Sequence, residues 1–193
     1  MVKTHRDTIS VNDCQVLAHY QFEADQYIIT LESKEIADST RPGQFVHLSV
    51  SGMLAMRRPI SVMSVDTDNG TFDLLYKIVG EGTKQLADRK IGDVLSVIGP
   101  IGNGFELTDR KIPLLIGGGV GMPPMIAIAQ KIKDNAYYNP YVILGSEVPF
   151  PFEASQSSLN GFNSSKFYTM PLLEEWRVPC GLASLQDYEG VYK

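Results

Sequence analysis

The first hundred residues alternate apolar and polar positions in short runs, the period of a strand with one buried face. Turn-forming residues separate the runs, which cover residues 15–22, 27–31, 44–50, 60–65, 71–79 and 94–98. Between the fourth and fifth runs, residues 66–70 end in Asn69-Gly70, a strong signal for a hairpin. One helix is expected, from Thr83 to about Arg89. Short strands with turns between them predict a small antiparallel β-barrel.

After Phe105 the pattern changes to that of an α/β protein. Residues 113–116 are continuously apolar, residues 124–133 have the period of a helix, and residues 141–144 form a second apolar run. Strand, helix and strand in this order open a parallel α/β unit. We therefore predict a β-barrel domain over residues 1–108 and an α/β domain over residues 109–193.

The end of the chain gives weaker signals. Residues 149–165 are rich in Ser, Asn and Pro and are expected to form a loop or an irregular helix, and residues 166–170 are a candidate third strand. Pro179-Cys180-Gly181 is interpreted as a turn, with no convincing strand after it. A doubly wound domain normally has five or more strands. With about three strands predicted, the α/β domain is expected to be incomplete.

Composition and charge exclude several classes of protein. The formal net charge is -5 and there is no run of Lys or Arg, so nucleic acid is not an expected partner. No apolar stretch approaches the roughly 20 residues that span a bilayer, and the N-terminus lacks the apolar core of a signal peptide. We therefore expect a cytoplasmic protein without a membrane segment.

Metal chemistry is also not expected from the residue types present. Cys14 and Cys180 are the two cysteines, and both are expected to be reduced thiols. Two cysteines do not complete the four-ligand set of a [2Fe–2S] cluster. The three histidines show no metal-ligand spacing.

A glycine-rich loop after the first apolar run of the second domain predicts a phosphate site. Gly117-Gly118-Gly119-Val120-Gly121 ends a strand, and two prolines then open a helix whose N-terminus favours anions. No Gly-Lys-Ser/Thr follows, so the loop is not a P-loop. Glu147, just past the next strand, is either a ligand of a ribose or a solvated carboxylate.

Two motifs in the barrel have both a structural and a functional interpretation. Arg57-Arg58-Pro59-Ile60-Ser61 is either a surface Arg pair before an edge proline or a guanidinium and hydroxyl that hold a phosphate ligand. Gly80-Glu81-Gly82-Thr83 is either a turn capped by Thr83 or a second phosphate cradle.

The ordered set of these motifs indicates a protein family more specifically than any single motif does. The set resembles the ferredoxin–NADP reductase superfamily, and within it the electron-transfer subunits of dihydroorotate dehydrogenase, over roughly residues 10 to 145. The matching segments are Pro42-Gly43-Gln44-Phe45, Arg58-Pro59-Ile60-Ser61, Gly80-Glu81-Gly82-Thr83, residues 99–105 and Gly117-Gly118-Gly119-Val120-Gly121.

The resemblance implies a flavin-binding barrel followed by a pyridine-nucleotide domain, with FAD and NAD(P)H as cofactors. Hydride would pass from NAD(P)H to FAD, and electrons would then pass to a partner subunit or redox protein. Ser61 would act in catalysis near the flavin N5. The other implied flavin contacts are Arg58 to the pyrophosphate, Pro59 and Ile60 to the isoalloxazine, Tyr76, Lys77 and Ile78 to the ribityl and adenosine side, and Gly82 and Thr83 to the pyrophosphate. Gly118, Gly119, Val120 and Gly121 would hold the diphosphate of NAD(P)H.

The chain departs from this pattern at three places. The Cys-Gly-Pro segment that many relatives have near the nicotinamide is missing, because Leu182 follows Cys180-Gly181. Ile60 stands where many superfamily members have an aromatic residue. Residues 173–182 are similar to the approach to the [2Fe–2S] loop of the dihydroorotate subunit, but only Cys180 of its cysteines is present. The rival hypothesis is a non-enzymatic barrel that keeps the fold without flavin and acts through partner contacts.

Overall fold

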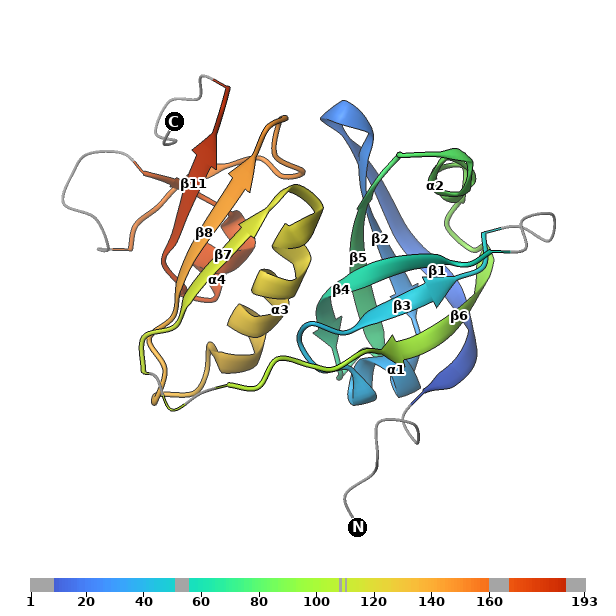
Figure 1. Cartoon of the computed structure of the whole chain (residues 1–193), viewed down its shortest axis with the longest axis horizontal. Helices are drawn as coiled ribbons and strands as arrows, with labels where there is room; N and C mark the ends of the chain where they lie inside the picture. Colours follow the sequence, from blue (N-terminus) through green and yellow to red (C-terminus); the bar gives the residue numbers. More distant parts are fainter. Residues whose placement is uncertain (1–8, 51–55, 108, 110, 160–166, 187–193) are drawn as a thin grey trace, which may run out of the picture.

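The N-terminal half is a closed antiparallel barrel, as its alternating pattern predicted (Figure 1). The computed structural model describes residues 9–50, 56–107, 109, 111–159 and 167–186. Neighbouring strands follow the order β1-β2-β5-β4-β3-β6. Their bounds are Ser10–Phe22 (β1), Gln26–Glu32 (β2), Phe45–Leu48 (β3), Arg58–Asp66 (β4), Thr71–Lys77 (β5) and Val94–Ile101 (β6).

Alternation along each strand fills the barrel interior. On β5, Phe72, Leu74 and Tyr76 are buried in the barrel core, while the residues between them face outward. The short helix α2, Glu81–Ala87, follows β5 and begins two residues before the predicted start, at Gly80 as N-cap. Glycine is among the residues that are favoured at an N-cap.

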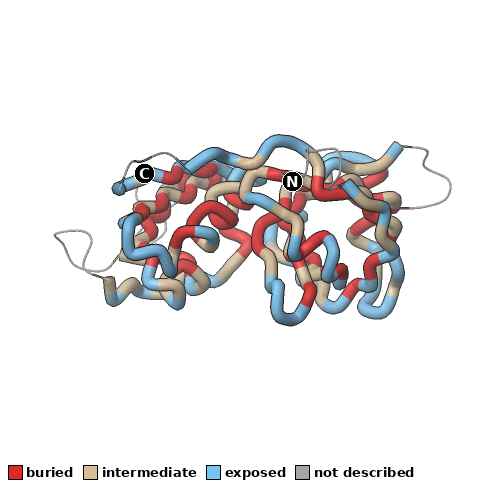
Figure 2. Tube along the Cα trace, turned by 90° about the horizontal axis from the view of Figure 1, so that it is seen from below, coloured by how far each residue is buried: buried red, intermediate tan, exposed pale blue. Residues whose placement is uncertain are grey.

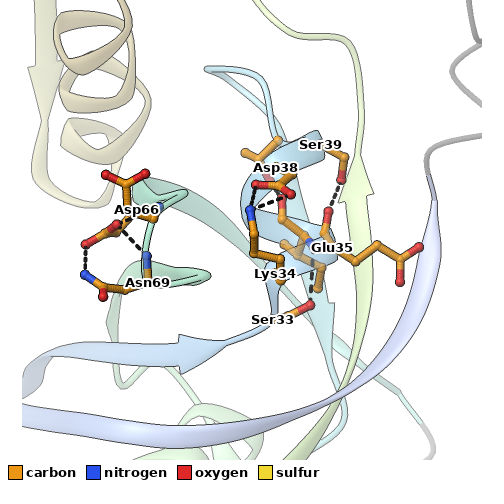
Figure 3. A network of polar contacts seen from close by, with 10 residues as sticks. Ser33, Lys34, Glu35, Asp38, Ser39, Asp66 and Asn69 are labelled. Atoms are coloured by element: carbon orange, nitrogen blue, oxygen red, sulfur yellow. Dashed lines mark hydrogen bonds and ion pairs between the residues drawn. The ribbon is translucent and has the colours of Figure 1, made fainter.

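The predicted hairpin between β4 and β5 is confirmed, and it packs on a helix that the sequence did not predict. Asp66 accepts hydrogen bonds from the backbone N–H of Asp68 and Asn69 and from the Asn69 side chain (Figure 3). The helix α1, Lys34–Ser39, is capped by the Ser33 hydroxyl, which accepts from Ile36 N at 3.3 Å. Gly70, at the end of the hairpin, lies so close to α1 that a Cβ there would be 3.2 Å from Lys34 Cα.

The C-terminal half is a partial parallel α/β unit, again as predicted. Three parallel strands have the order β11-β8-β7. Their bounds are Leu114–Gly118 (β7), Tyr141–Ser146 (β8) and Cys180–Ser184 (β11). The helix α3, Met122–Ile132, connects β7 to β8 and buries Ile126, Ala129 and Ile132 against the sheet. The turn η3, Gly119–Gly121, joins β7 to α3.

The third strand lies elsewhere than predicted. Lys166 lies outside the described residues, and of residues 167–170 Tyr168–Thr169 form a strand (β10), which pairs with Ser155–Gln156 (β9) in a separate two-stranded sheet. The turn interpretation of 179–181 is wrong, because Cys180 begins β11 and pairs in parallel register with Val142 of β8. Proline and glycine beside Cys180 favour a turn locally, but Cys180 and Leu182 bury their side chains in the α3 core. In the segment from 149 to 159 no helix forms, and residues 160–165 lie outside the described residues.

A short helix closes the C-terminal half against the same core. The helix α4, Pro171–Glu175, buries Leu173 beside Val178 and Cys180. The segment that resembles the approach to a [2Fe–2S] loop is therefore α4 followed by a buried strand.

The two halves pack directly on each other, with α3 between the parallel sheet and the barrel (Figure 1). Met63 and Leu75, on the outer face of the barrel, belong to the same buried cluster as the apolar face of α3. Gln130 of α3 accepts from Val65 N at 3.0 Å and donates to Val65 O at 2.8 Å. Buried residues therefore run through both halves (Figure 2). Our proposed domain boundary at residues 108/109 falls between the end of β6 and the start of β7.

Candidate functional site

The structure brings Arg58 and Gly82, two residues singled out separately in the sequence, into direct contact. A Cβ on Gly82 would lie 1.7 Å from Arg58 Nε and 2.5 Å from Cζ, so the guanidinium occupies the space that a side chain at position 82 would need. Arg58 begins β4 and Gly82 lies in the first turn of α2. A cation therefore lies against an open helix N-terminus, where N–H groups lack helical partners.

Arg58 is half-buried and has no ion-pair or hydrogen-bond partner within the described ranges. A partly buried guanidinium normally pairs with an anion, because removing its water costs energy. The site therefore suits a bound phosphate, which would accept from both the guanidinium and the helix N–H groups.

Thr83 supports this cradle from within. Its hydroxyl accepts from Val79 N at 2.9 Å and Gly80 N at 3.2 Å and donates to Gly80 O at 3.0 Å. The hydroxyl thus fixes the turn that precedes α2. The donors left for an anion are the backbone N–H groups of the first helical turn.

Arg57, the other member of the pair, has a structural role. It donates to Ser96 O at 2.7 Å and to Ser96 Oγ at 3.0 Å, which ties the start of β4 to β6. The side chains of Arg57 and Arg58 therefore have different surroundings, because successive side chains of an extended segment point in opposite directions.

The next residues of β4 alternate in the same way. Pro59 is exposed and Ser61 is half-buried, whereas Ile60 is only 7% exposed and belongs to the barrel core. Most of the Ile60 side chain is thus committed to packing, and Pro59 and Ser61 are the residues that offer surface. The Ser61 hydroxyl makes no hydrogen bond to another residue among those described.

The inner and outer faces of the barrel also separate the three residues at the end of β5, which are Tyr76, Lys77 and Ile78. Tyr76 stacks on Tyr27 in the barrel, with ring centroids 5.3 Å apart, and its hydroxyl lies 2.8 Å from His19 Nε2. Burial raises the pKa of Tyr76, so its phenol remains protonated. Ile78 packs against the same core, and only Lys77 faces outward toward the second domain.

The second glycine loop is built from backbone alone. Gly119 has φ +51°, a left-handed conformation that side chains disfavour. Gly117 packs tightly, since a Cβ there would be 2.9 Å from Gly121 O. The two prolines at the start of α3 carry no N–H, so donors for a phosphate come from the loop itself.

A cavity of about 670 Å³ joins the two halves at this loop. Lys77 lines it from the barrel, and Gly118, Gly119 and Val120 line it from the α/β half. Glu147, the residue after β8, is also in the lining. The cavity thus lies at the carboxyl ends of the parallel strands, where open α/β sheets bind their ligands.

Several lining residues were missed by sequence reasoning: Gln26, Val79, Gly145, Ser146, Val148, Ala183, Ser184 and Leu185. Ala183, Ser184 and Leu185 lie at the end of β11 or directly after it, and they were missed because this segment was interpreted as a turn with no strand after it. Val79 lines the cavity and is 84% exposed, so it adds an apolar surface to the lining.

Other kinds of site find little support in the part of the chain that the structure describes. No cluster of three or more His, Cys, Asp or Glu side chains there is suited to a metal ion. No helix among these residues has the length and apolar character to cross a membrane. Cys14 and Cys180 are free thiols, buried in the barrel core and in the α/β core respectively.

Comparison with known proteins agrees with this geometry. Residues 13–105 match the family model of the oxidoreductase FAD-binding domain. The "Dihydroorotate dehydrogenase B (NAD(+)), electron transfer subunit" of Bacillus cereus (strain 03BB102) is 31% identical over 195 residues, covering 86% of this chain and 73% of that protein. The same subunit of Bacillus anthracis (strain CDC 684 / NRRL 3495) matches with the same identity and coverage.

Solved structures show the same fold. The NADH-dependent reduced ferredoxin–NADP oxidoreductase superposes with a TM-score of 0.75 and 22% identity, covering 100% of this chain, which spans 61% of that one. The ferredoxin reductase of carbazole 1,9a-dioxygenase has a TM-score of 0.71 and 19% identity, covering 97% of this chain and 56% of that one. The chain is therefore a member of the FAD-binding, ferredoxin reductase-like oxidoreductases and belongs to the family of dihydroorotate dehydrogenase B electron-transfer subunits.

Proposed function

We propose that this chain moves a hydride between NADH and an FAD held on its barrel, and exchanges electrons with a partner subunit or redox protein. The transfer is reversible, so the same site would serve a partner that delivers electrons to NAD⁺. By analogy with the similar subunits, the partner would be a catalytic subunit that oxidises dihydroorotate.

The observation that carries the proposal is the pairing of Arg58 with Gly82. The guanidinium has no anionic partner among the described side chains and lies over the open end of α2, which fits the pyrophosphate of FAD. When bound, FAD supplies the redox chemistry, accepting a hydride and releasing electrons singly or in pairs. The protein contributes the placement of the flavin and the charges around it.

Ser61 and Lys77 are the side chains that we assign to the flavin ring. Both residues alternate with core residues on adjacent strands of the barrel and so face outward from it, and Lys77 lines the cavity shared with the α/β half. Ser61 would donate its hydroxyl proton in a hydrogen bond near the flavin N5. Lys77 would place a positive charge beside a ring that becomes more negative on reduction.

The second glycine loop would hold the dinucleotide across the cavity. Its backbone N–H groups would meet the diphosphate, and Glu147 would accept hydrogen bonds from the ribose hydroxyls. A carboxylate at this position repels the additional phosphate of NADPH. We therefore propose NADH as the nucleotide, in keeping with the NAD(+) of the similar subunits.

Spectroscopy of the purified chain tests the two parts of the proposal separately. The protein is incubated with FAD, freed of excess flavin, and mixed without oxygen with NADH or NADPH. Retained flavin absorption and its bleaching by NADH, more readily than by NADPH, are expected. A protein that stays colourless refutes the flavin site and supports the non-enzymatic barrel, whereas retained colour without bleaching refutes only the hydride transfer.

A further inference from the structure

Gln26, at the start of β2, connects the barrel to the loop that follows β8. It is 2% exposed, and its side-chain nitrogen donates to Pro149 O at 2.7 Å and to Glu23 O at 3.1 Å. Both partners are carbonyl oxygens, which only accept, so the amide nitrogen is the atom that faces them. One buried side chain thus tethers a segment far along the sequence to the rim of the barrel.

The tethered segment is one wall of the cavity. Glu147 and Val148, which line the cavity, immediately precede Pro149. The Ser146 hydroxyl accepts from Val148 N at 3.3 Å, so the segment is also held to the end of β8. The position of Pro149 therefore determines where this wall stands.

The opposite wall is attached to the same residue through the sheet. Gln26 is the direct cross-strand partner of Lys77, which lines the cavity from the barrel. Gln26 itself is part of the lining. A single residue therefore joins the flavin side of the cavity to its nucleotide side.

We propose that Gln26 is a positioning residue that sets the spacing of the two cavity walls, and with it the approach of the nicotinamide to the flavin. This inference rests on the hydride transfer proposed above. Hydride transfer needs reacting atoms in close, aligned contact, and a displacement of about 1 Å can slow an enzyme roughly a hundred-fold. Binding of each cofactor depends on its own phosphate cradle and is much less sensitive to the spacing.

The test compares Gln26→Met with Gln130→Met. Methionine keeps the length of glutamine and removes the amide donors. Gln130 provides a matched control because it also bonds across the domain interface, to Val65, but lines a different cavity. Gln26→Glu is the second variant, which keeps the size and places carboxylate oxygens against the two carbonyls.

Two measurements are made on each protein. In the chain without cofactors, hydrogen exchange at residues 147, 148 and 150 is expected to quicken roughly ten-fold in Gln26→Met, as for one lost hydrogen bond. In the FAD-loaded chain, the limiting rate of flavin reduction by NADH is expected to fall about ten-fold or more. The dissociation constants of FAD and NADH are expected to stay within about two-fold, and Gln130→Met should change neither the local exchange nor the rate.

The outcomes separate this inference from the function on which it rests. A wild-type chain that binds FAD but is not reduced by NADH overturns both. If NADH reduces the flavin of the wild type and reduces that of Gln26→Met and Gln26→Glu at the wild-type rate, the inference alone is overturned. Equal slowing in Gln26→Met and Gln130→Met also overturns it, because interface stability would then explain the effect.

Discussion

The two glycine loops of this protein are both suited to phosphate, but they are built differently. The loop before α2 has Arg58 lying across Gly82 and is braced by the Thr83 hydroxyl. In the loop before α3 no side chain fills the space beside the glycines in this way, since no atom lies within 4 Å of a Cβ at Gly119 or Gly121, and Lys77 lines the same cavity from the barrel. One cradle has a guanidinium lying directly on its glycine, and the other leaves its glycines open to the cavity that Lys77 also lines.

This difference fits the roles of the two ligands. A charge-assisted contact is about twice as strong as a neutral one, which suits a cofactor that stays bound through many turnovers. A cradle of N–H groups binds more weakly and lets a nucleotide leave after it has reacted. Under the proposed function, the resident ligand would therefore be held by the barrel and the exchanging ligand by the α/β half.

The largest expected effect is the loss of the charge. Arg58→Ala removes the guanidinium from the cradle and should weaken FAD binding by about 2–4 kcal/mol, roughly thirty-fold to several hundred-fold. Titration of the chain with FAD, followed by flavin fluorescence, measures the change.

The neighbouring arginine provides the control. Arg57→Ala removes hydrogen bonds to Ser96 and should lower the free energy of unfolding by about 1–3 kcal/mol, with little change in FAD affinity of the folded protein. If both variants lose flavin equally, Arg58 holds no phosphate and the contrast between the two loops disappears.

A smaller effect is expected from displacing the guanidinium without removing it. In Gly82→Ala the new methyl group takes the place of Arg58 Nε, and FAD affinity should fall about ten-fold. Alanine is a better helix former than glycine, so α2 itself is not weakened. Gly80→Ala is the matched control, since no atom lies within 4 Å of a Cβ there. An undiminished affinity in Gly82→Ala would show that the position of Arg58 is unimportant.

The second loop should respond independently of the first. Gly119→Val forces a branched side chain into φ +51° and should raise the KM for NADH about ten-fold, because left-handed backbone costs such a residue about 1–2 kcal/mol. Bound flavin should be unaffected. Gly121→Ala, with no atom within 4 Å and a φ of -90°, should behave as the wild type. Loss of FAD from Gly119→Val would mean that the two loops serve one ligand.

The smallest expected effect is on the reactivity of the two thiols, one of which is buried in the core of each half. Burial raises the pKa of Cys14 to about 12 and that of Cys180 to about 11. Both should resist a thiol reagent at about pH 8 in the native protein and react after denaturation, since the thiolate is the nucleophile. Because the folded state keeps these thiols protonated, their contribution to stability is present below the unfolded pKa of about 8.5 and is lost as pH rises toward the folded values. Rapid reaction of Cys180 in the native state would contradict its burial in β11.

Different parts of the fold were accessible to sequence reasoning to different degrees. The barrel strands and the β4–β5 hairpin were predicted because alternation and the Asn69-Gly70 turn are local signals. The strand β11 was missed because Pro179 and Gly181 favour a turn, and only pairing with β8 overrides them. Helix α1 was missed as well, although Ser33 at its N-cap is a recognisable start signal.

The candidate site, like the fold, could be predicted only in part from the sequence. Motif order predicted Arg58, Gly82 and the loop of Gly118 as cofactor residues, but not which of the neighbouring side chains would be open to a ligand. The structure shows that Ile60 and Tyr76 pack into the barrel core while Lys77 faces the cavity. Gln26 had no signal in the sequence, because a single glutamine at a strand start has no distinguishing pattern.

The sequence by itself determined the barrel, the onset of the α/β unit and the family, because alternation, glycine turns and motif order are properties of neighbouring residues. Only the tertiary structure decided that Arg58 lies over Gly82, and that Lys77 and the loop of Gly118 share one cavity. These contacts join segments that are separated in the chain. They exist because the barrel closes and because α3 and Gln26 hold the second half against it.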